Sequence, residues 1–265
     1  MPEGNGRSDP ASAPVAREPA AREIARERPF VVPPQQFYRT ASLPCPYIRG
    51  RVERKLVTEL AGRNAEAFYN ALSRAGFRRS HNLAYRPACA GCQACQPVRI
   101  PVAEFALTRS LRRIRNLNRD LAARLVAPAV TVEQFRLFLR YQRLRHPDSD
   151  MAAMTYGDYR AMVEDSPVDT RLIELRDGDQ QLRGACLLDV LDDGLSAVYS
   201  FYDPADGNRS LGNLLVLALI DHALERRLPY VYLGYLIAES PKMAYKARFR
   251  PLEGLEPGGW RRTIG

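Results

Sequence analysis

The stretch "LRGACLLDVLDDGLSAVYSFYDP", residues 182–204, decides the fold together with the helical pattern that follows it. Two β-rich segments flank the turn "DDG", which indicates an antiparallel hairpin. The preceding "TRLIELRD", residues 170–177, adds a strand through the turn "GDQQ". Residues 210–228, "SLGNLLVLALIDHALERRL", show helical spacing with Ser210 as the predicted N-cap. Residues 229–236, "PYVYLGYL", then predict a buried strand.

Two more helices are predicted before this meander. They are "TVEQFRLFLRYQRLRH", with Thr131 as the N-cap, and "TYGDYRAMVEDS", residues 155–166. The order of two helices, meander, helix and strand resembles a GNAT acyltransferase domain. Those domains hold a pyrophosphate at an R/Q-x-x-G-x-G/A turn before the long helix. "RSLGNL" supplies Arg209 and Gly212 of this turn but not its last small residue.

The bulk composition is that of a globular protein that needs no disulfide framework. The chain has 265 residues, of which 46% are apolar and 26% charged, and it contains five cysteines. No apolar run approaches the roughly 20 residues of a membrane helix, and the N-terminus lacks a secretory h-region. We therefore expect a cytoplasmic protein without a membrane partner.

The positive charge is concentrated in one block of the chain. Residues 30–125 carry 17 basic residues against five acidic ones, a net +12, whereas residues 126–265 carry 17 against 20, a net −3. Arginine is abundant throughout, as base composition alone could produce, but that would not segregate the charge. The block therefore predicts a polyanionic partner, RNA or DNA.

We expect three parts and an α+β fold. Residues 1–29, rich in Pro, Ala and charge, predict a disordered tail. Residues 30–126 predict a basic N-terminal α/β domain that carries a cysteine cluster. Residues 127–265 predict the GNAT-like domain, with a mixed, largely antiparallel sheet.

"TRSLRRIRNLNRDLAARL", residues 108–125, predicts an amphipathic helix. Its apolar residues fall within about 120° of the helical wheel, from Leu111 to Leu125. The opposite face is basic and contains one acid, which favours phosphate binding. A membrane surface is the alternative, which the lack of aromatics in the apolar stripe disfavours. The predicted RNA-binding residues of this face are Arg109, Arg112, Arg113 and Arg119.

Four segments, taken in order, resemble one family. They are "CPYIRGRVERKLVTEL", "GFRRSHNLAYRPACAGCQACQPVRIPVAEF", "SFYDPADGNRSLGNLLVLALIDHA" and "YVYLGYLIAESPKMAYKARFRPLE". They look like the bacterial aspartate/glutamate leucyltransferases, which belong to the arginyl-tRNA–protein transferase family of the N-degron pathway. The resemblance runs from about Phe37 to Trp260. It implies transfer of an amino acid from charged tRNA to the α-amine of proteins that begin with Asp or Glu.

The resemblance directs attention to polar residues of the C-terminal half. Asp203 could accept the amine proton or be a turn residue, and Tyr199 and Tyr202 could hydrogen-bond the ester or belong to the core. Arg209, Ser210 and Gly212 are predicted to meet the terminal phosphates of the tRNA. Binding an acceptor protein that begins with Asp or Glu requires a cationic side chain. The remaining candidates are Tyr235 for catalysis and Arg78, Arg79, Arg86, Lys246, Arg248 and Glu239 for substrate binding.

The cysteines Cys89, Cys92 and Cys95 stand two residues apart, and Cys45 is a natural fourth. Four thiolates could hold a structural zinc ion or an iron–sulfur cluster. Related eukaryotic transferases are thought to carry a cluster there, but this chain has one cysteine where they have two. The alternative is a set of buried thiols without metal. The transfer reaction itself requires no cofactor, because the aminoacyl ester is already activated.

Three alternative functions remain open at this point. The donor could be arginyl-tRNA in the same reaction, because donor choice depends on the shape of a pocket. A CoA-dependent N-acetyltransferase would use Arg209 and Gly212 on pyrophosphate but leaves the basic block unexplained. A non-catalytic RNA-binding protein leaves the GNAT-like half unexplained.

Overall fold

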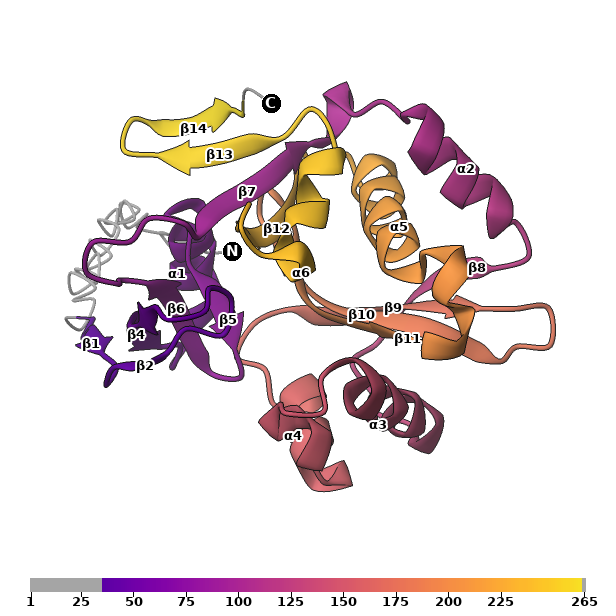
Figure 1. Cartoon of the computed structure of the whole chain (residues 1–265), viewed down its shortest axis with the longest axis horizontal. Helices are drawn as coiled ribbons and strands as arrows, with labels where there is room; N and C mark the ends of the chain where they lie inside the picture. The colour runs from indigo at the N-terminus through magenta and orange to yellow at the C-terminus, as the bar shows by residue number, and fades with distance from the viewer. Residues whose placement is uncertain (1–34, 264–265) are drawn as a thin grey trace, which may run out of the picture. The chain divides into compact units, whose positions relative to one another are not determined.

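The computed structural model describes residues 35–263, and the predicted tail at residues 1–29 lies outside them. A small sheet with the order β1-β4-β6-β5 comes first, next to a two-stranded ribbon of β2 and β3 (Figure 1). Helix α1 ends before Gly76, which adopts a φ of +83°, a backbone angle that glycine commonly supplies just after a helix. These elements are β1 (Tyr38–Arg39), β2 (Leu43–Pro44), β3 (Val52–Glu53), β4 (Lys55–Glu59), α1 (Ala65–Arg74), β5 (Arg78–Ser80) and β6 (Leu83–Pro87).

The large sheet has eight strands in the order β14-β13-β7-β12-β11-β10-β9-β8. All neighbouring pairs are antiparallel except β11 and β12, which helix α5 connects in parallel. The expected mixed, largely antiparallel sheet and GNAT-like order are thus confirmed. Its strands are β7 (Gln96–Pro101), β8 (Ala122–Val126), β9 (Thr170–Arg176), β10 (Leu182–Leu191), β11 (Gly194–Tyr202), β12 (Tyr230–Leu236), β13 (Glu253–Glu256) and β14 (Gly259–Arg262).

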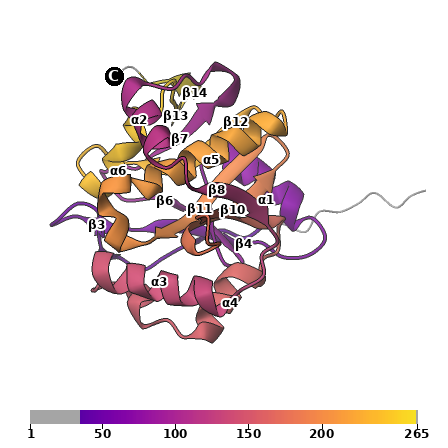
Figure 2. The same cartoon turned by 90° about the vertical axis from the view of Figure 1, so that its right-hand side faces the viewer.

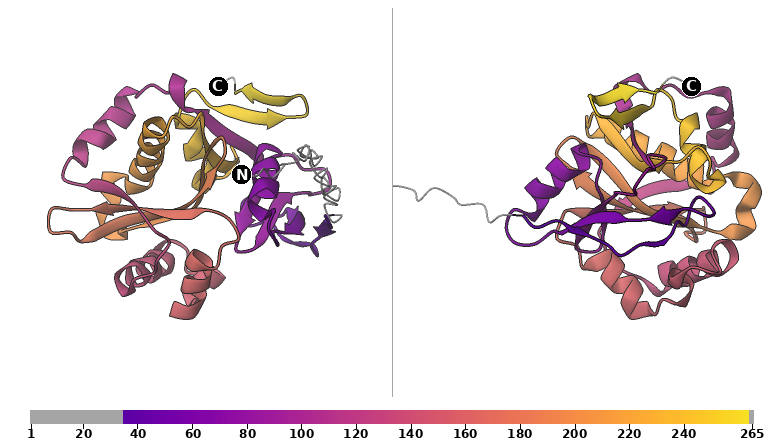
Figure 3. Two further views of the ribbon diagram at one scale, coloured as in Figure 1. Left: turned by 180° about the vertical axis from the view of Figure 1, so that it is seen from behind. Right: turned by 60° about the vertical axis from the view of Figure 1, so that its left-hand side comes forward.

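Helices cover both faces of the sheet. α2 and α5 lie on one face and α3 and α4 on the other, as Figure 1 and the view from behind in Figure 3 show. Each pair of helices encloses its own apolar core, and Cys186 is fully buried in the core under α5. The helices and short turns are η1 (Val102–Glu104), α2 (Arg109–Leu117), α3 (Val132–Arg145), η2 (Asp150–Ala153), α4 (Tyr156–Glu164), η3 (Pro204–Arg209), α5 (Leu211–Glu225), α6 (Pro241–Ala244) and η4 (Tyr245–Arg248).

The amphipathic helix is shorter than the sequence predicted. α2 ends at Leu117, and residues 122–126 form the edge strand β8 instead of continuing the helix. The buried Asn118 ends the helix, because its Nδ2 donates to the carbonyl oxygens of Ile114 and Arg209, at 2.8 and 2.9 Å. The helical prediction beyond Leu117 was therefore wrong, since pairing with β9 overrides the local periodicity.

The large sheet draws strands from both sides of the boundary expected between residues 126 and 127. Strands β7 and β8 precede this boundary and pair with β12 and β9, which follow it. The division of the chain into two domains at this position stays a prediction.

The parallel pair β11 and β12 separates after three registered residues. Gly194, Leu195 and Ser196 pair with Tyr230, Val231 and Tyr232. Where the pairing ends, the Arg78 guanidinium donates to the Ser196 hydroxyl at 2.9 Å and to the Ala197 carbonyl oxygen. Gly234 has a φ of +79°, and a Cβ there would lie 3.1 Å from Arg78 Nε. Glycine is thus required at this position both for its backbone angle and for its contact with Arg78.

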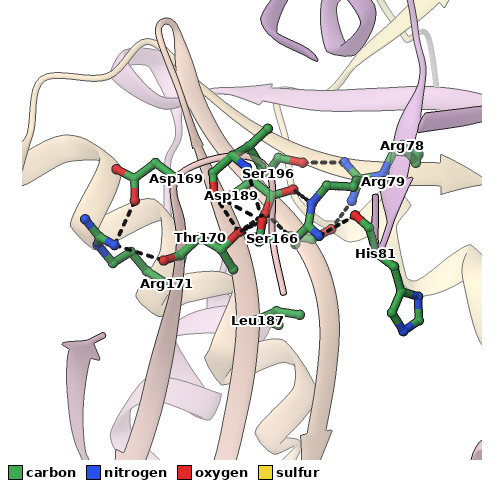
Figure 4. A network of polar contacts seen from close by, with 12 residues as sticks. Arg78, Arg79, His81, Ser166, Asp169, Thr170, Arg171, Leu187, Asp189 and Ser196 are labelled. Atoms are coloured by element: carbon green, nitrogen blue, oxygen red, sulfur yellow. Dashed lines mark hydrogen bonds and ion pairs between the residues drawn. The ribbon is translucent and has the colours of Figure 1, made fainter. Parts of the chain in front are cut away.

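A buried ion pair joins the small sheet to the large one. Arg79 on β5 makes two hydrogen bonds to the Asp189 carboxylate on β10, at 2.8 and 2.6 Å, and both side chains are fully buried (Figure 4). Thr170 on β9 donates to the same carboxylate at 2.9 Å, and Ser166 is within 2.6 Å of the Thr170 hydroxyl. Both carboxylate oxygens are therefore engaged, as a charge in this environment requires.

We expect Arg79→Ala to lower the free energy of unfolding by about 3–5 kcal/mol, because it leaves the Asp189 charge buried without a partner. Urea unfolding measures this loss. The matched control is Arg74→Ala, which removes an exposed pair with Asp192 and should cost less than about 1 kcal/mol. Combining Arg79→Met with Asp189→Leu should restore much of the stability. Equal losses for Arg79→Ala and Arg74→Ala would contradict this account.

Candidate functional site

Several predicted site residues gather where β11 ends. Asp203 follows this strand and caps η3, since its carboxylate accepts a hydrogen bond from the Ala205 N–H at 3.1 Å. Its second oxygen lies 2.7 Å from Arg140 Nη2 and 3.7 Å from Arg183 Nη1. Asp203 is 4% exposed, and its carboxylate already has partners on both oxygens. The role of Asp203 as a proton acceptor stays a prediction, whereas its capping of η3 is observed in the structure.

Tyr199 and Tyr202 extend the site along β11. Gln142 on α3 donates from Nε2 to the Tyr199 hydroxyl at 2.6 Å, and burial raises the pKa of Tyr199. The Tyr199 hydroxyl therefore stays protonated and keeps its own proton for another acceptor. The Tyr202 ring packs against Tyr141, with ring centres 4.9 Å apart.

The "RSLG" turn connects η3 to α5 and contacts the end of α2. Arg209 donates to Asn118 Oδ1 at 2.9 Å and pairs with Asp120. Ser210 stands at the N-cap position but has a φ of 55° and makes no side-chain capping hydrogen bond, so the predicted capping role was wrong. Gly212 faces Tyr202, and a Cβ there would lie 3.0 Å from Tyr202 Cε1. A larger residue at position 212 would therefore crowd the Tyr202 ring.

Tyr235 is not brought to the β11 end. The residue is 5% exposed, and its hydroxyl is 3.1 Å from each of the carbonyl oxygens of Gly76 and Tyr85. Burial raises the pKa of Tyr235. Glu239, beyond the end of β12, is exposed and pairs with Arg51 at 3.4 Å.

The arginines predicted to bind the acceptor differ in access. Arg78 and Arg79 are 8% and 3% exposed and make the internal contacts described above. Substrate binding by either residue would have to compete with these contacts, and it stays a prediction. Arg86 and Arg248 are exposed. The Arg86 guanidinium lies 5.2 Å from the centre of the Phe77 ring.

Lys246 is buried without a carboxylate partner in the described part of the chain. It is 5% exposed, and its Nζ donates to the Tyr235 carbonyl oxygen at 2.6 Å. Burial, together with the nearby Arg78, lowers the pKa of Lys246 to about 7. A lysine in this setting is partly neutral near pH 7, unlike a lysine at the surface.

The four N-terminal cysteines converge but do not form a ligand set in this conformation. All four are free and partly buried. Arg51 donates to Cys92 Sγ at 3.2 Å, and the Arg54 N–H donates to Cys89 Sγ at 3.3 Å. Burial and the three neighbouring thiols raise the pKa of Cys95 to about 11. Within residues 35–263, no three His, Cys, Asp or Glu side chains are placed to hold a metal ion.

The two basic helices are exposed on opposite faces of the sheet. Arg109, Arg112 and Arg113 on α2, and Arg119 just beyond its end, are exposed. Sequence reasoning missed the second basic surface, on α3, where Arg136, Arg140 and Arg143 are exposed on one face. Their spacing of four and three residues was the available signal. The slightly negative net charge of residues 126–265 obscured it.

None of the helices between residues 35 and 263 has the length and apolar character that crossing a bilayer requires.

Comparison with known proteins shows that two parts of the chain match the N-terminal and C-terminal models of one family, in that order. The N-terminal and C-terminal sequence profiles of "Arginine-tRNA-protein transferase" match residues 43–113 and 133–256. The aspartate/glutamate leucyltransferase of Paramagnetospirillum magneticum is 56% identical over 229 residues, which is 86% of this chain and 94% of the relative. That of Granulibacter bethesdensis is 56% identical over 228 residues, covering 86% and 85%. The solved structure of L-PGS from Bacillus licheniformis aligns with a TM-score of 0.43 and 9% identity, covering 68% of this chain and 54% of that one.

We expect Lys246 to make stability rise with pH. Its pKa of about 7 lies below the value of 10.5 for an unperturbed lysine. Between these values the unfolded chain binds a proton that the folded chain does not, so the free energy of unfolding increases with pH, by up to about 1.4 kcal/mol per pH unit. Urea unfolding at pH 7, 8 and 9 should show this slope and its loss in Lys246→Met. The matched control, Lys242→Met, changes an exposed lysine and should keep the wild-type slope. Parallel profiles for all three proteins would refute the assignment.

Proposed function

Because this chain belongs to the arginyl-tRNA–protein transferase family, we propose that it transfers leucine from Leu-tRNA to the N-terminal α-amine of proteins that begin with Asp or Glu. The observation that carries this proposal is 56% identity to an aspartate/glutamate leucyltransferase along 94% of that protein. The transfer would mark the acceptor for degradation. Charged tRNA is a cytoplasmic reactant, so the proposed reaction takes place in the cytoplasm.

The proposed reaction makes modest chemical demands. The α-amine attacks the ester carbonyl carbon, the amide bond forms, and the terminal ribose hydroxyl of the tRNA leaves. A free α-amine has a pKa of about 7.7–8.0, so mild desolvation leaves much of it neutral. Holding the two reactants in line would supply most of the rate.

The residues at the β11 end support this chemistry. Tyr199 accepts from Gln142 and keeps a proton that it could donate to the developing oxyanion. The N-terminus of α5, which has no side-chain cap, is suited to a terminal phosphate of the tRNA. Asp203 binds Arg140 and Arg183, which favours a positioning role beside its proposed role as proton acceptor.

Recognition of the acceptor requires a cation for its acidic first side chain. Arg86 and Arg248 are the exposed members of the predicted set, whereas Arg78 and Arg79 are buried in internal contacts. We therefore place the acceptor carboxylate near an exposed arginine, where a bidentate contact is available.

The test is a transfer assay with purified protein, Leu-tRNA or Arg-tRNA, and peptides that begin with Asp, Glu or Ala. We expect mass spectrometry to detect leucine on the Asp and Glu peptides at a rate at least roughly a hundredfold above the Ala peptide, because a site built for a carboxylate rejects the analogue that lacks it. Efficient transfer from Arg-tRNA would favour the arginyl alternative. Turnover of acetyl-CoA without a response to charged tRNA would favour an N-acetyltransferase.

We further propose that Cys45, Cys89, Cys92 and Cys95 bind a structural zinc ion or an iron–sulfur cluster. Four thiols from neighbouring segments have the donor chemistry for either group. The four cysteine side chains would have to move closer together to hold the metal. No step of the proposed transfer reaction depends on that metal.

Elemental analysis and the visible spectrum of anaerobically purified protein test the metal proposal. We expect bound zinc without colour or bound iron with a broad brown absorbance, and loss of that metal in each single Cys→Ser variant. The control is Cys186→Ser, which lies in the core and should keep the metal. Wild-type protein that is stable and free of metal would contradict the proposal.

A further inference from the structure

Helix α3 presents a basic and apolar surface from which the site described above uses only Arg140, through its ion pair with Asp203. Arg136, Arg140 and Arg143 are exposed at spacings of four and three residues, and Leu144 is 66% exposed beside them. Together with Leu139 they line a surface hollow of about 410 Å³. We call these five residues the α3 surface. Figure 2 shows α3 on the outside of the large sheet, where a large ligand can reach it.

Most of the charge of the α3 surface is free. Within residues 35–263 an ion pair is recorded for Arg140, with Asp203, but not for Arg136 or Arg143. A solvated charged face usually carries both signs. Three guanidinium groups with no acid in the same hollow instead match a polyanion.

The position of α3 links this surface to the proposed chemistry. Arg140 reaches Asp203 at the start of η3, and Gln142 on the same helix reaches Tyr199. The aminoacyl ester stands at the 3′ end of the tRNA. RNA that leads to this ester must therefore pass close to α3 if Tyr199 and Asp203 have the roles proposed above.

We propose that the α3 surface binds the single-stranded 3′ end of the donor tRNA. Guanidinium groups bind phosphate and also stack on bases, and the two leucines add apolar contact for base or ribose faces. In a duplex these base faces are covered by their neighbours, so a surface that combines charge and apolar contact suits an unpaired strand. The basic face of α2 is then left for the paired part of the tRNA. The inference rests on the proposed function and extends it to a particular part of the substrate.

The experiment measures binding of uncharged tRNA at several salt concentrations, without transfer. The probes are the intact tRNA and the same tRNA without its single-stranded 3′ nucleotides. Arg136→Gln with Arg143→Gln should weaken binding of intact tRNA roughly tenfold and lower the salt slope by about 1.4, the value for two contacts to a single strand. Binding of the shortened tRNA should not change.

Two matched variants control for charge and for folding. Arg226→Gln with Arg227→Gln removes the same charge from exposed residues at the far end of α5, about 22 Å from η3 for a helix of 15 residues, and should leave both probes unaffected. Arg136→Lys with Arg143→Lys keeps the charge, so it should restore the salt slope but not the full affinity, because lysine cannot stack as arginine does.

The outcomes separate this inference from the proposed function. Wild-type protein that binds no tRNA would overturn both. Normal tRNA binding by the Arg136→Gln, Arg143→Gln variant would overturn the inference alone, and an equal loss with both probes would overturn the assignment to the 3′ end. If the variant binds tRNA normally but has a raised KM for a peptide beginning with Asp, the α3 surface binds the acceptor instead.

Discussion

The buried pair of Arg79 and Asp189 constrains how the small sheet docks on the large one. Removing two charges from water costs several kcal/mol per ion, and the cost is offset only when the geometry satisfies both groups. Here two guanidinium hydrogen bonds and the Thr170 hydroxyl meet the one carboxylate. A shift of β5 by one residue would turn Arg79 away and leave Asp189 uncompensated. The pair therefore specifies the docking of the sheets more than it adds stability.

This docking shapes the candidate site through the neighbouring arginine. With Arg79 fixed, Arg78 on the same strand is directed to Ser196 and Ala197, where β11 leaves β12. The end of β11 is then free to carry Tyr199 and Tyr202 toward α3 and α5, with Asp203 directly after it. Of the arginines that the sequence offered for the acceptor, Arg78 and Arg79 thus make internal contacts, whereas Arg86 and Arg248 are exposed.

The basic helices α2 and α3 offer the proposed substrate two separate positively charged surfaces. α2 carries its arginines on one face of the sheet, and α3 carries a smaller set on the other. The turn η3 contacts the end of α2 through Arg209 and contacts α3 through Asp203. The residues proposed to meet the end of the tRNA therefore lie between two surfaces suited to phosphate. An enzyme that reacts at the tip of a long polyanion benefits from contacts on both sides of that tip.

The sequence by itself determined the meander, the long helix and the parallel strand, because their periodicities are local and strong. It also determined the family, which four long segments carry. Tertiary structure alone decided where α2 ends, because β8 gains its ladder from β9, a strand more than forty residues away. Tertiary structure also gave Arg78, Arg79 and Tyr235 internal hydrogen bonds, since their partners come from segments far away in the sequence. A list of charged residues cannot tell a buried pair from a binding site, because the difference lies in which distant strand supplies the opposite charge.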